Sequence, residues 1–268
     1  MITAGQQGFI NKALPVFKRD ERIAGVALGG SYIRGTMDEY SDLNFIIAIL
    51  PGHVDSVMAD RRDIAEKLGT LLSFFPGDHA GMPNMLICLY DEPLIHVDLH
   101  FVPLDALRRR MENPVIVYER GTLLSDEYAG EKAGEPKFDL QWAEDRFWIW
   151  VHYAANRIAR GELFDVITAL STLRVQILGP MIQVKHGVIP FGVRHIEKIA
   201  PEETVQLAQT IASHDRQHCI RALKAATDLY IYLRGANKSP LYHRADAQKR
   251  ALRYLSQISD KFAGDKPE

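Results

Sequence analysis

Three oxygen-bearing side chains are the residues of this 268-residue sequence whose types and spacing best fit metal-ion chemistry. Asp42 and Asn44 stand two residues apart at the head of an apolar run, and Asp98 interrupts the alternating segment Ile95 to Phe101. Side chains two residues apart on a strand share a face, so Asp42 and Asn44 point the same way. If the two strands are neighbours, Asp98 joins them in an oxygen cluster of the kind that suits Mg²⁺ or Mn²⁺.

A glycine-rich turn before this cluster suits a phosphate group. Gly29, Gly30 and Ser31 follow the apolar run Ile23 to Leu28. Glycines let backbone approach a phosphate closely, and Ser31 offers a hydroxyl and an N–H at an expected helix N-terminus, where anions are favoured. Arg34, one turn further, can reach a phosphate with its guanidinium fork.

The pattern resembles that of the polymerase-beta-like nucleotidyltransferase superfamily, in which G-S is followed by S-D-x-D and a third Asp on a later strand. The local sequence from Gly30 to Thr36 and from Tyr40 to Asp42 is most similar to that of bacterial aminoglycoside and lincosamide adenylyltransferases. The motif resemblance covers residues 25–102. Beyond it, the helical second half with Trp148 to Arg157 resembles the C-terminal bundles of those enzymes only in style.

The resemblance implies a metal-dependent transferase that moves a nucleoside monophosphate, AMP from ATP, to a hydroxyl of a small molecule. Gly29, Gly30, Ser31 and Arg34 would bind the nucleotide. Asp42, Asn44 and Asp98 would hold the metal, with Asp42 and Asp98 as catalytic residues. Two metals would stabilise the attacking and leaving oxygens together. A base on the helical half would help to deprotonate the acceptor, and the available carboxylates are Glu144, Asp145, Glu162 and Asp165.

Asn44 departs from the family pattern, which has a second Asp at this position. An amide oxygen can bind a cation but brings no charge, so the cluster has two negative charges in place of three and attracts a divalent ion less strongly. Two readings stay open: an enzyme whose incoming nucleotide recruits the metal, or a catalytically weak nucleotide-binding or regulatory protein on the same fold. Nucleotide transfer to a protein is a third hypothesis.

Other polar and aromatic residues have simpler interpretations beside functional ones. His96 and His100 line a polar sheet face, or form a His-Asp-His metal site with Asp98. Trp148 and Trp150 are more typical of a core or an interface than of a substrate platform. Cys88 lies in an apolar strand and is expected to be a buried small hydrophobe.

The elements expected to position these residues are mixed in the first half of the chain. Apolar spacing predicts helices over 9–17 and 54–75, and strands over 23–28, 43–50, 85–90 and 94–102. Asp91 to Pro93 is expected to join the last two strands in a hairpin.

The second half is predicted to be helical. Helices are expected over 140–160, ending at Gly161, over 166–181, from Pro201 onward, from Ile220 to a point near Gly235, and over 245–258. The polar stretch 129–137 is the expected linker. The fold class is therefore α+β: a small mixed-sheet nucleotidyltransferase domain with flanking helices over 1–125, and an α-helical domain over 126–268.

Composition limits the function classes. A net charge of −2 gives no general attraction to nucleic acid or to a membrane surface, so neither is an expected partner. Two distant cysteines give no disulfide framework, and no signal peptide or membrane-length apolar run is visible, which together favour the cytoplasm. The expected partners are a nucleotide and a small hydroxylated acceptor, in the manner of an antibiotic-resistance enzyme.

Overall fold

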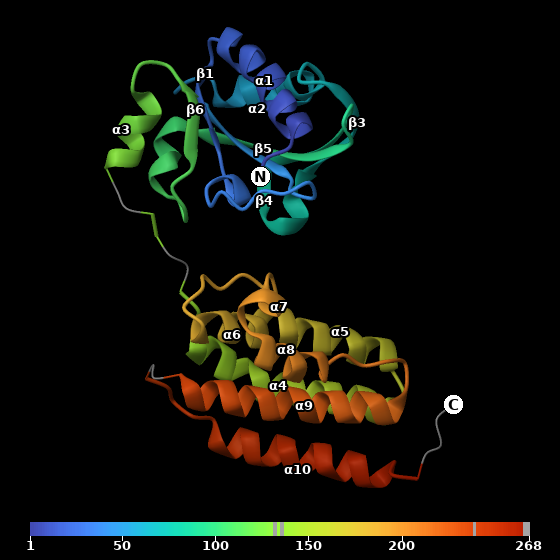
Figure 1. Cartoon of the computed structure of the whole chain (residues 1–268). Coiled ribbons are helices and arrows are strands. Elements are labelled where there is room, and N and C mark those ends of the chain that lie inside the picture. Colours follow the sequence, from blue (N-terminus) through green and yellow to red (C-terminus); the bar gives the residue numbers. More distant parts are fainter. Residues whose placement is uncertain (131–132, 135–136, 238–239, 265–268) are drawn as a thin grey trace. The chain divides into compact units, whose positions relative to one another are not determined.

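The computed structural model describes residues 1–130, 133–134, 137–237 and 240–264. The chain forms two compact units, Met1–Glu135 and Pro136–Glu268 (Figure 1). The expected domain boundary between residues 125 and 126 falls inside α3 (Leu123–Ala129), which packs against strands of the first unit. Residues 131–132 and 135–136 of the expected linker lie outside the described residues.

The first unit is built on a six-stranded mixed sheet with the order β3-β4-β5-β2-β1-β6. The central strands β2 and β5 are parallel, and the other neighbouring pairs are antiparallel. The strands are β1 (Ile23–Leu28), β2 (Leu43–Ile49), β3 (Thr70–Gly77), β4 (Met82–Asp91), β5 (Ile95–Pro103) and β6 (Val115–Glu119).

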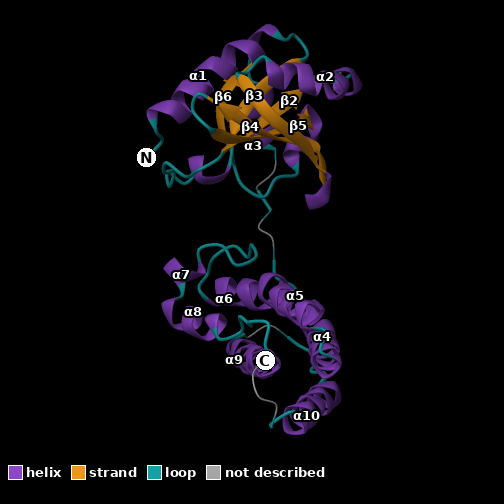
Figure 2. Ribbon diagram, turned by 90° about the vertical axis from the view of Figure 1, so that its right-hand side faces the viewer, coloured by secondary structure: helices purple, strands orange, loops and turns teal. Residues whose placement is uncertain are grey.

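The two faces of this sheet differ in what covers them. Helices α1 (Ala4–Arg19) and α2 (Val54–Glu66) lie on one face, as Figure 2 shows, and bury the main apolar core with the sheet. On the opposite face, α3 and the short 3₁₀ segment η3 (Leu104–Arg108) form a smaller core against β1 and β2. That smaller core leaves the polar side chains of β5 partly exposed.

The sequence patterns located most of these elements. The four predicted strands correspond to β1, β2, β4 and β5, and β4 and β5 form the predicted hairpin. The helix predicted over 54–75 is wrong beyond Glu66, because Thr70–Gly77 forms the edge strand β3. Its apolar residues fit a helical period, but the threonine and aromatic residues of this stretch pair with β4 instead. Strand β6 was not predicted.

The second unit is helical, which confirms the α+β class and the predicted helical second half. Helix α4 ends at Gly161, whose φ of 76° confirms the predicted C-terminal glycine. The helix predicted over 166–181 is interrupted by a π-helical turn, η4. The elements are α4 (Leu140–Arg160), α5 (Leu163–Leu173), η4 (Arg174–Leu178), α6 (Gly179–Lys185), α7 (Ile196–Ile199), α8 (Pro201–Ala208), α9 (Arg216–Ala236) and α10 (Ala245–Lys261).

The core of this unit contains Trp148, which is 2% exposed, while Trp150 is partly buried against Trp142. Cys88 of the first unit is 2% exposed, as expected for a small buried hydrophobe. Among the described residues, no helix is both long and apolar enough to cross a membrane.

Candidate functional site

The parallel pairing of β2 with β5 brings two of the predicted site residues into register. Asn44 on β2 lies directly opposite Asp98 on β5, while the alternate residues Leu43 and Val97 face the core. Asp42 precedes β2 by one residue and lies close enough to Asp98 for its charge to affect that carboxyl. The three side chains therefore gather on one face of the sheet, as the period of two requires.

Asn44 makes a specific contact inside this cluster. Its amide nitrogen Nδ2 donates a hydrogen bond to Oδ1 of Asp42 at 3.1 Å. The donor orientation follows from the partner, since an ionised carboxylate only accepts hydrogen bonds. Position 44 thus supplies a hydrogen-bond donor that holds Asp42 in place, where a carboxylate would repel it.

Asp98 is a partly buried carboxylate with a histidine beside it. Its side chain is 16% exposed and lies 2.9 Å from Nε2 of His96. Burial raises the pKa of the Asp98 carboxyl; the neighbouring His96 and His100 oppose that increase, and the charge of Asp42 adds to it. Burial also lowers the pKa of His100, which favours a neutral imidazole there. Burial and the charge of Asp42 therefore disfavour the ionised form of Asp98, while the two imidazoles favour it.

The glycine turn reaches the same place from β1. Gly30 has φ 63°, and a Cβ at this position would lie 3.1 Å from Nδ2 of Asn44. Gly29 has an ordinary extended backbone, and its nearest neighbour is 3.7 Å from the Cβ position. Only Gly30 is thus required by local geometry.

The expected helix after this turn is not formed. Gly30–Tyr32 is a three-residue 3₁₀ segment, η1, and the chain then continues through turns toward β2. The expectation that Ser31 stands at a helix N-terminus is therefore wrong, because so short a segment sums few aligned peptide dipoles. The turn can offer a phosphate only its individual N–H groups and the Ser31 hydroxyl.

Arg34 lies beyond η1 and is 54% exposed in its side chain. Its Nη1 donates to Glu112 in an ion pair. A surface pair of this kind contributes little stability, so the guanidinium can exchange Glu112 for a phosphate at small cost.

One residue that positions the loop before Asp42 was not among the site residues predicted from the sequence. Gln6 of α1 is 3% exposed, and its Nε2 donates to the carbonyls of Asp38 and Ser41 at 2.9 and 2.8 Å. These bonds anchor the loop that leads into Asp42. The Thr3–Gln6 capping box is a recognisable sequence signal for the start of α1, but the side chain's second task depends on the tertiary fold.

The donor set decides how a metal could be held. No group of three or more His, Cys, Asp or Glu side chains in the described part of the chain is arranged to bind a metal, so the His-Asp-His alternative has no support. Asp42 and Asp98 supply two carboxylates on one face. That set fits a single Mg²⁺, which proteins commonly bind through one or two carboxylates, with water and substrate phosphates as the remaining ligands.

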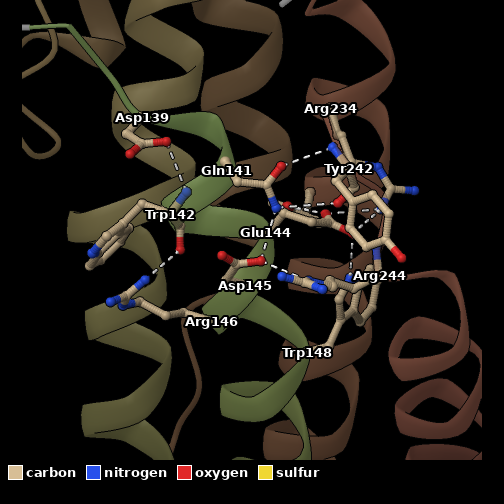
Figure 3. A network of polar contacts seen from close by, with 11 residues as sticks. Asp139, Gln141, Trp142, Glu144, Asp145, Arg146, Trp148, Arg234, Tyr242 and Arg244 are labelled. Carbon is tan, nitrogen blue, oxygen red and sulfur yellow. Dashed lines mark hydrogen bonds and ion pairs between the residues drawn. The ribbon is translucent and has the colours of Figure 1, made fainter. Parts of the chain in front are cut away.

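The candidate bases on the helical unit all have partners in this structure. The Glu144 side chain is fully buried and contacts Arg234 and the backbone N–H of Arg244 (Figure 3). It also accepts a hydrogen bond from the hydroxyl of Tyr230. Glu144 therefore has a structural role, and its buried carboxylate is not accessible to an acceptor substrate. The other three carboxylates are more exposed: Asp145 pairs with Arg244, Glu162 with Arg157, and Asp165 with Tyr153 and Arg157.

Comparison with solved structures gives several neighbours of low identity. An aminoglycoside 6-adenyltransferase from Bacillus subtilis is 15% identical, with a TM-score of 0.41 and coverage of 96% of this chain and 99% of that chain. A nucleotidyltransferase-like protein from Exiguobacterium sibiricum is 14% identical, with a TM-score of 0.39 and coverage of 97% and 91%.

A third neighbour is a spectinomycin adenyltransferase from Enterococcus faecialis in complex with ATP and spectinomycin. It is 13% identical, with a TM-score of 0.29 and coverage of 94% of this chain and 99% of that chain. No protein-family model and no curated protein matches the chain.

Proposed function

We propose that this protein is a nucleotidyltransferase that moves a nucleoside monophosphate, AMP from ATP, to a hydroxyl of a small molecule. The observation that carries the proposal is the register of β2 and β5, which places Asn44 opposite Asp98 beside Asp42 and Gly30. Two carboxylates on one sheet face can bind the cation of a nucleoside triphosphate, and the tight glycine turn beside them can approach its phosphates.

Each residue has a definite task in this proposal. Asp42 and Asp98 would hold a divalent cation, which when bound neutralises phosphate charge as pyrophosphate leaves. Asn44 holds Asp42 in place through its amide hydrogen bond. Gly30 lets the backbone of the turn approach the phosphates, with Ser31 and Arg34 as further donors. Asp98 would lie beside the attacking hydroxyl.

The direct test is a screen for pyrophosphate release. Purified protein is incubated with Mg²⁺ or Mn²⁺, each common nucleoside triphosphate and a panel of hydroxylated small molecules. Release that depends on the cation and on a small acceptor supports the proposal. Release that depends only on an added protein acceptor would instead support protein modification, and nucleotide binding without release would support a binding protein.

The variant Asn44→Asp tests whether position 44 belongs to the metal site. It replaces the donor to Asp42 with a third carboxylate, so we expect Mg²⁺ to bind about tenfold more tightly. Without metal, the added repulsion should cost the protein about 1 kcal/mol of stability. Titration calorimetry with Mg²⁺ in the presence of ATP measures the affinity, and turnover at limiting Mg²⁺ should rise with it. Unchanged Mg²⁺ affinity would remove position 44 from the metal site.

The variant Gly30→Ala tests the phosphate turn, and Gly35→Ala is its matched control. Both glycines have positive φ, 63° and 62°, so both alanines should cost about 1–2 kcal/mol of stability. Only the Gly30 methyl group would press on Asn44, because nothing lies within 4 Å of a Cβ at Gly35. We therefore expect ATP affinity, measured by calorimetry, to fall at least tenfold in Gly30→Ala alone. If the two variants bound ATP with equal affinity, the glycine motif would be only a turn without a role in phosphate binding.

A further inference from the structure

The sheet face that carries the candidate site continues into an apolar surface. In register across the sheet, Asn44 on β2 lies opposite Asp98 on β5, Asp98 lies opposite Ile87 on β4, and Ile87 lies opposite Phe75 on β3. One row therefore runs from an amide and a carboxylate to an isoleucine and a phenylalanine. Neighbouring strands are about 4.8 Å apart, so Phe75 is about 10 Å from the carboxylate strand.

A second row of paired residues shows the same change from polar side chains on β5 to apolar side chains on β4. His96 on β5 lies opposite Leu89 on β4, which lies opposite Ser73 on β3. Leu89 is 38% exposed and Phe75 is 49% exposed, and the Phe75 ring packs on His79 with 5.5 Å between ring centroids. We call Phe75, Ile87 and Leu89 the apolar strip.

The charge pattern of this face narrows the kind of molecule that could use it. On this face the side chains along the middle of β3 and β4 carry no charge: Ser73, Phe75, Met85, Ile87 and Leu89. Asp91, the last residue of β4, is the one carboxylate of these two strands that is in phase with them. A polycationic acceptor gains most from carboxylates around its amines, and none lies among the apolar side chains in the middle of these two strands. An acceptor with an apolar body could remain on the strip while its hydroxyl reaches the carboxylates.

We propose that the apolar strip binds the apolar part of a small acceptor whose hydroxyl group is held near Asp98. This inference rests on the proposed function, and its basis is continuity: the strip begins one strand away from the carboxylate that would face the reacting hydroxyl. Exposed apolar side chains that adjoin polar groups on one face commonly mark ligand sites. The acceptor class is thus an amphipathic hydroxylated molecule, with an aromatic or aliphatic portion about 5–10 Å from its reactive oxygen.

The test compares two small hydroxylated probes, one with an aromatic group and one with only a methyl group in its place. Phenyl β-D-glucoside and methyl β-D-glucoside are titrated into the full chain, and the methyl resonances of Ile87 and Leu89 are followed by NMR. Each titration is run with and without Mg²⁺ and a non-hydrolysable ATP analogue. We expect saturable shifts of these methyl groups with the phenyl probe, and an affinity at least tenfold lower for the methyl probe.

Variants locate the binding. Phe75→Ser should weaken the phenyl probe about tenfold, whereas Phe75→Leu, which keeps an apolar side chain, should retain most of the affinity. Leu94→Ser is the control, because Leu94 is 68% exposed and lies in the turn between β4 and β5, outside the strip. Binding of the ATP analogue should be unchanged in all three variants.

Other outcomes would overturn the inference. Equal affinities for the two probes, or no shift at Ile87 and Leu89, would leave the strip without an acceptor role. Shifts of these methyl groups with the ATP analogue alone would assign the strip to the nucleobase. A dimer that Phe75→Ser converts to a monomer, measured by light scattering, would assign it to a second copy of the chain. Failure of the ATP analogue to bind would contradict the proposed function separately, since probe binding is also measured without it.

Discussion

Replacement of Glu144 with alanine should destabilise the helical unit by about 3–5 kcal/mol, because removal of one partner from a buried ion pair leaves the other charge uncompensated. Both carboxylate oxygens of Glu144 lie 3.1 Å from Nη1 of Arg234, whose side chain is 10% exposed. The same carboxylate accepts hydrogen bonds from the indole N–H of Trp148 and the backbone N–H of Arg244 (Figure 3), and from the hydroxyl of Tyr230. All of these donors would lose their acceptor together.

Tryptophan fluorescence makes the measurement specific to this unit. The sequence has three tryptophans, and all of them, Trp142, Trp148 and Trp150, lie on α4. Urea unfolding followed by fluorescence therefore reports the helical unit. The control is Asp145→Ala, next to Glu144 on the same helix, which removes the half-exposed pair with Arg244 and should cost far less stability than Glu144→Ala. Equal costs at the two positions would contradict the structural role of Glu144.

The pH dependence gives a second check on the same residue. Burial alone would raise the pKa of the Glu144 carboxyl, but hydrogen bonds from Tyr230, the Arg244 backbone and Arg234 outweigh it, and the pKa is lowered. A carboxyl whose pKa is lower in the folded state stabilises the protein above its unfolded pKa, near 4.5, and loses that contribution as the pH falls through the folded value. The stability difference between wild type and Glu144→Gln should therefore shrink below pH 4.5.

How far the sequence predicts this site depends on the range of the contacts involved. Alternation along single strands was enough to place Asp42 and Asn44 on one face and Asp98 on the polar face of β5. The register between those strands was not predictable, because it arises from the pairing of segments about fifty residues apart. The apolar strip was not predictable for a related reason: Phe75, one of its three residues, lies in the part of β3 for which the apolar spacing predicted a helix.

The role of Asn44 also depends on contacts that the sequence alone does not predict. The sequence reveals that a charge is absent at this position, and nothing more. The structure adds that the amide nitrogen lies between the Asp42 carboxylate and the glycine turn, with Nδ2 3.1 Å from Oδ1 of Asp42 and 3.1 Å from the Cβ position of Gly30. An aspartate here would repel Asp42 unless a cation lay between them, so the asparagine lets the face stay ordered without one.

Exchange of Asp98 for asparagine should abolish nucleotide transfer and, at the same time, stabilise the first unit at neutral pH. The loss of activity should be at least about 1000-fold, because a carboxylate that holds the cation contributes several kcal/mol to charge stabilisation during transfer. The gain in stability follows from the sign of the pKa change. The Asp98 pKa is raised in the folded state, so the ionised form opposes folding, and that cost is present whenever the pH lies above the folded value. A neutral amide removes the cost and can still bond to His96.

Calorimetric unfolding of the full chain measures the second half of this prediction. The transition of the first unit should move upward by a few degrees, at roughly 4 °C for each kcal/mol, while the tryptophan-reported transition of the helical unit stays in place. The control is Asp63→Asn, an exposed carboxylate on α2, which should change neither activity nor the transition. A lower transition together with lost activity would make Asp98 a structural residue. A higher transition with activity intact would show that the carboxylate is costly but plays no part in the reaction.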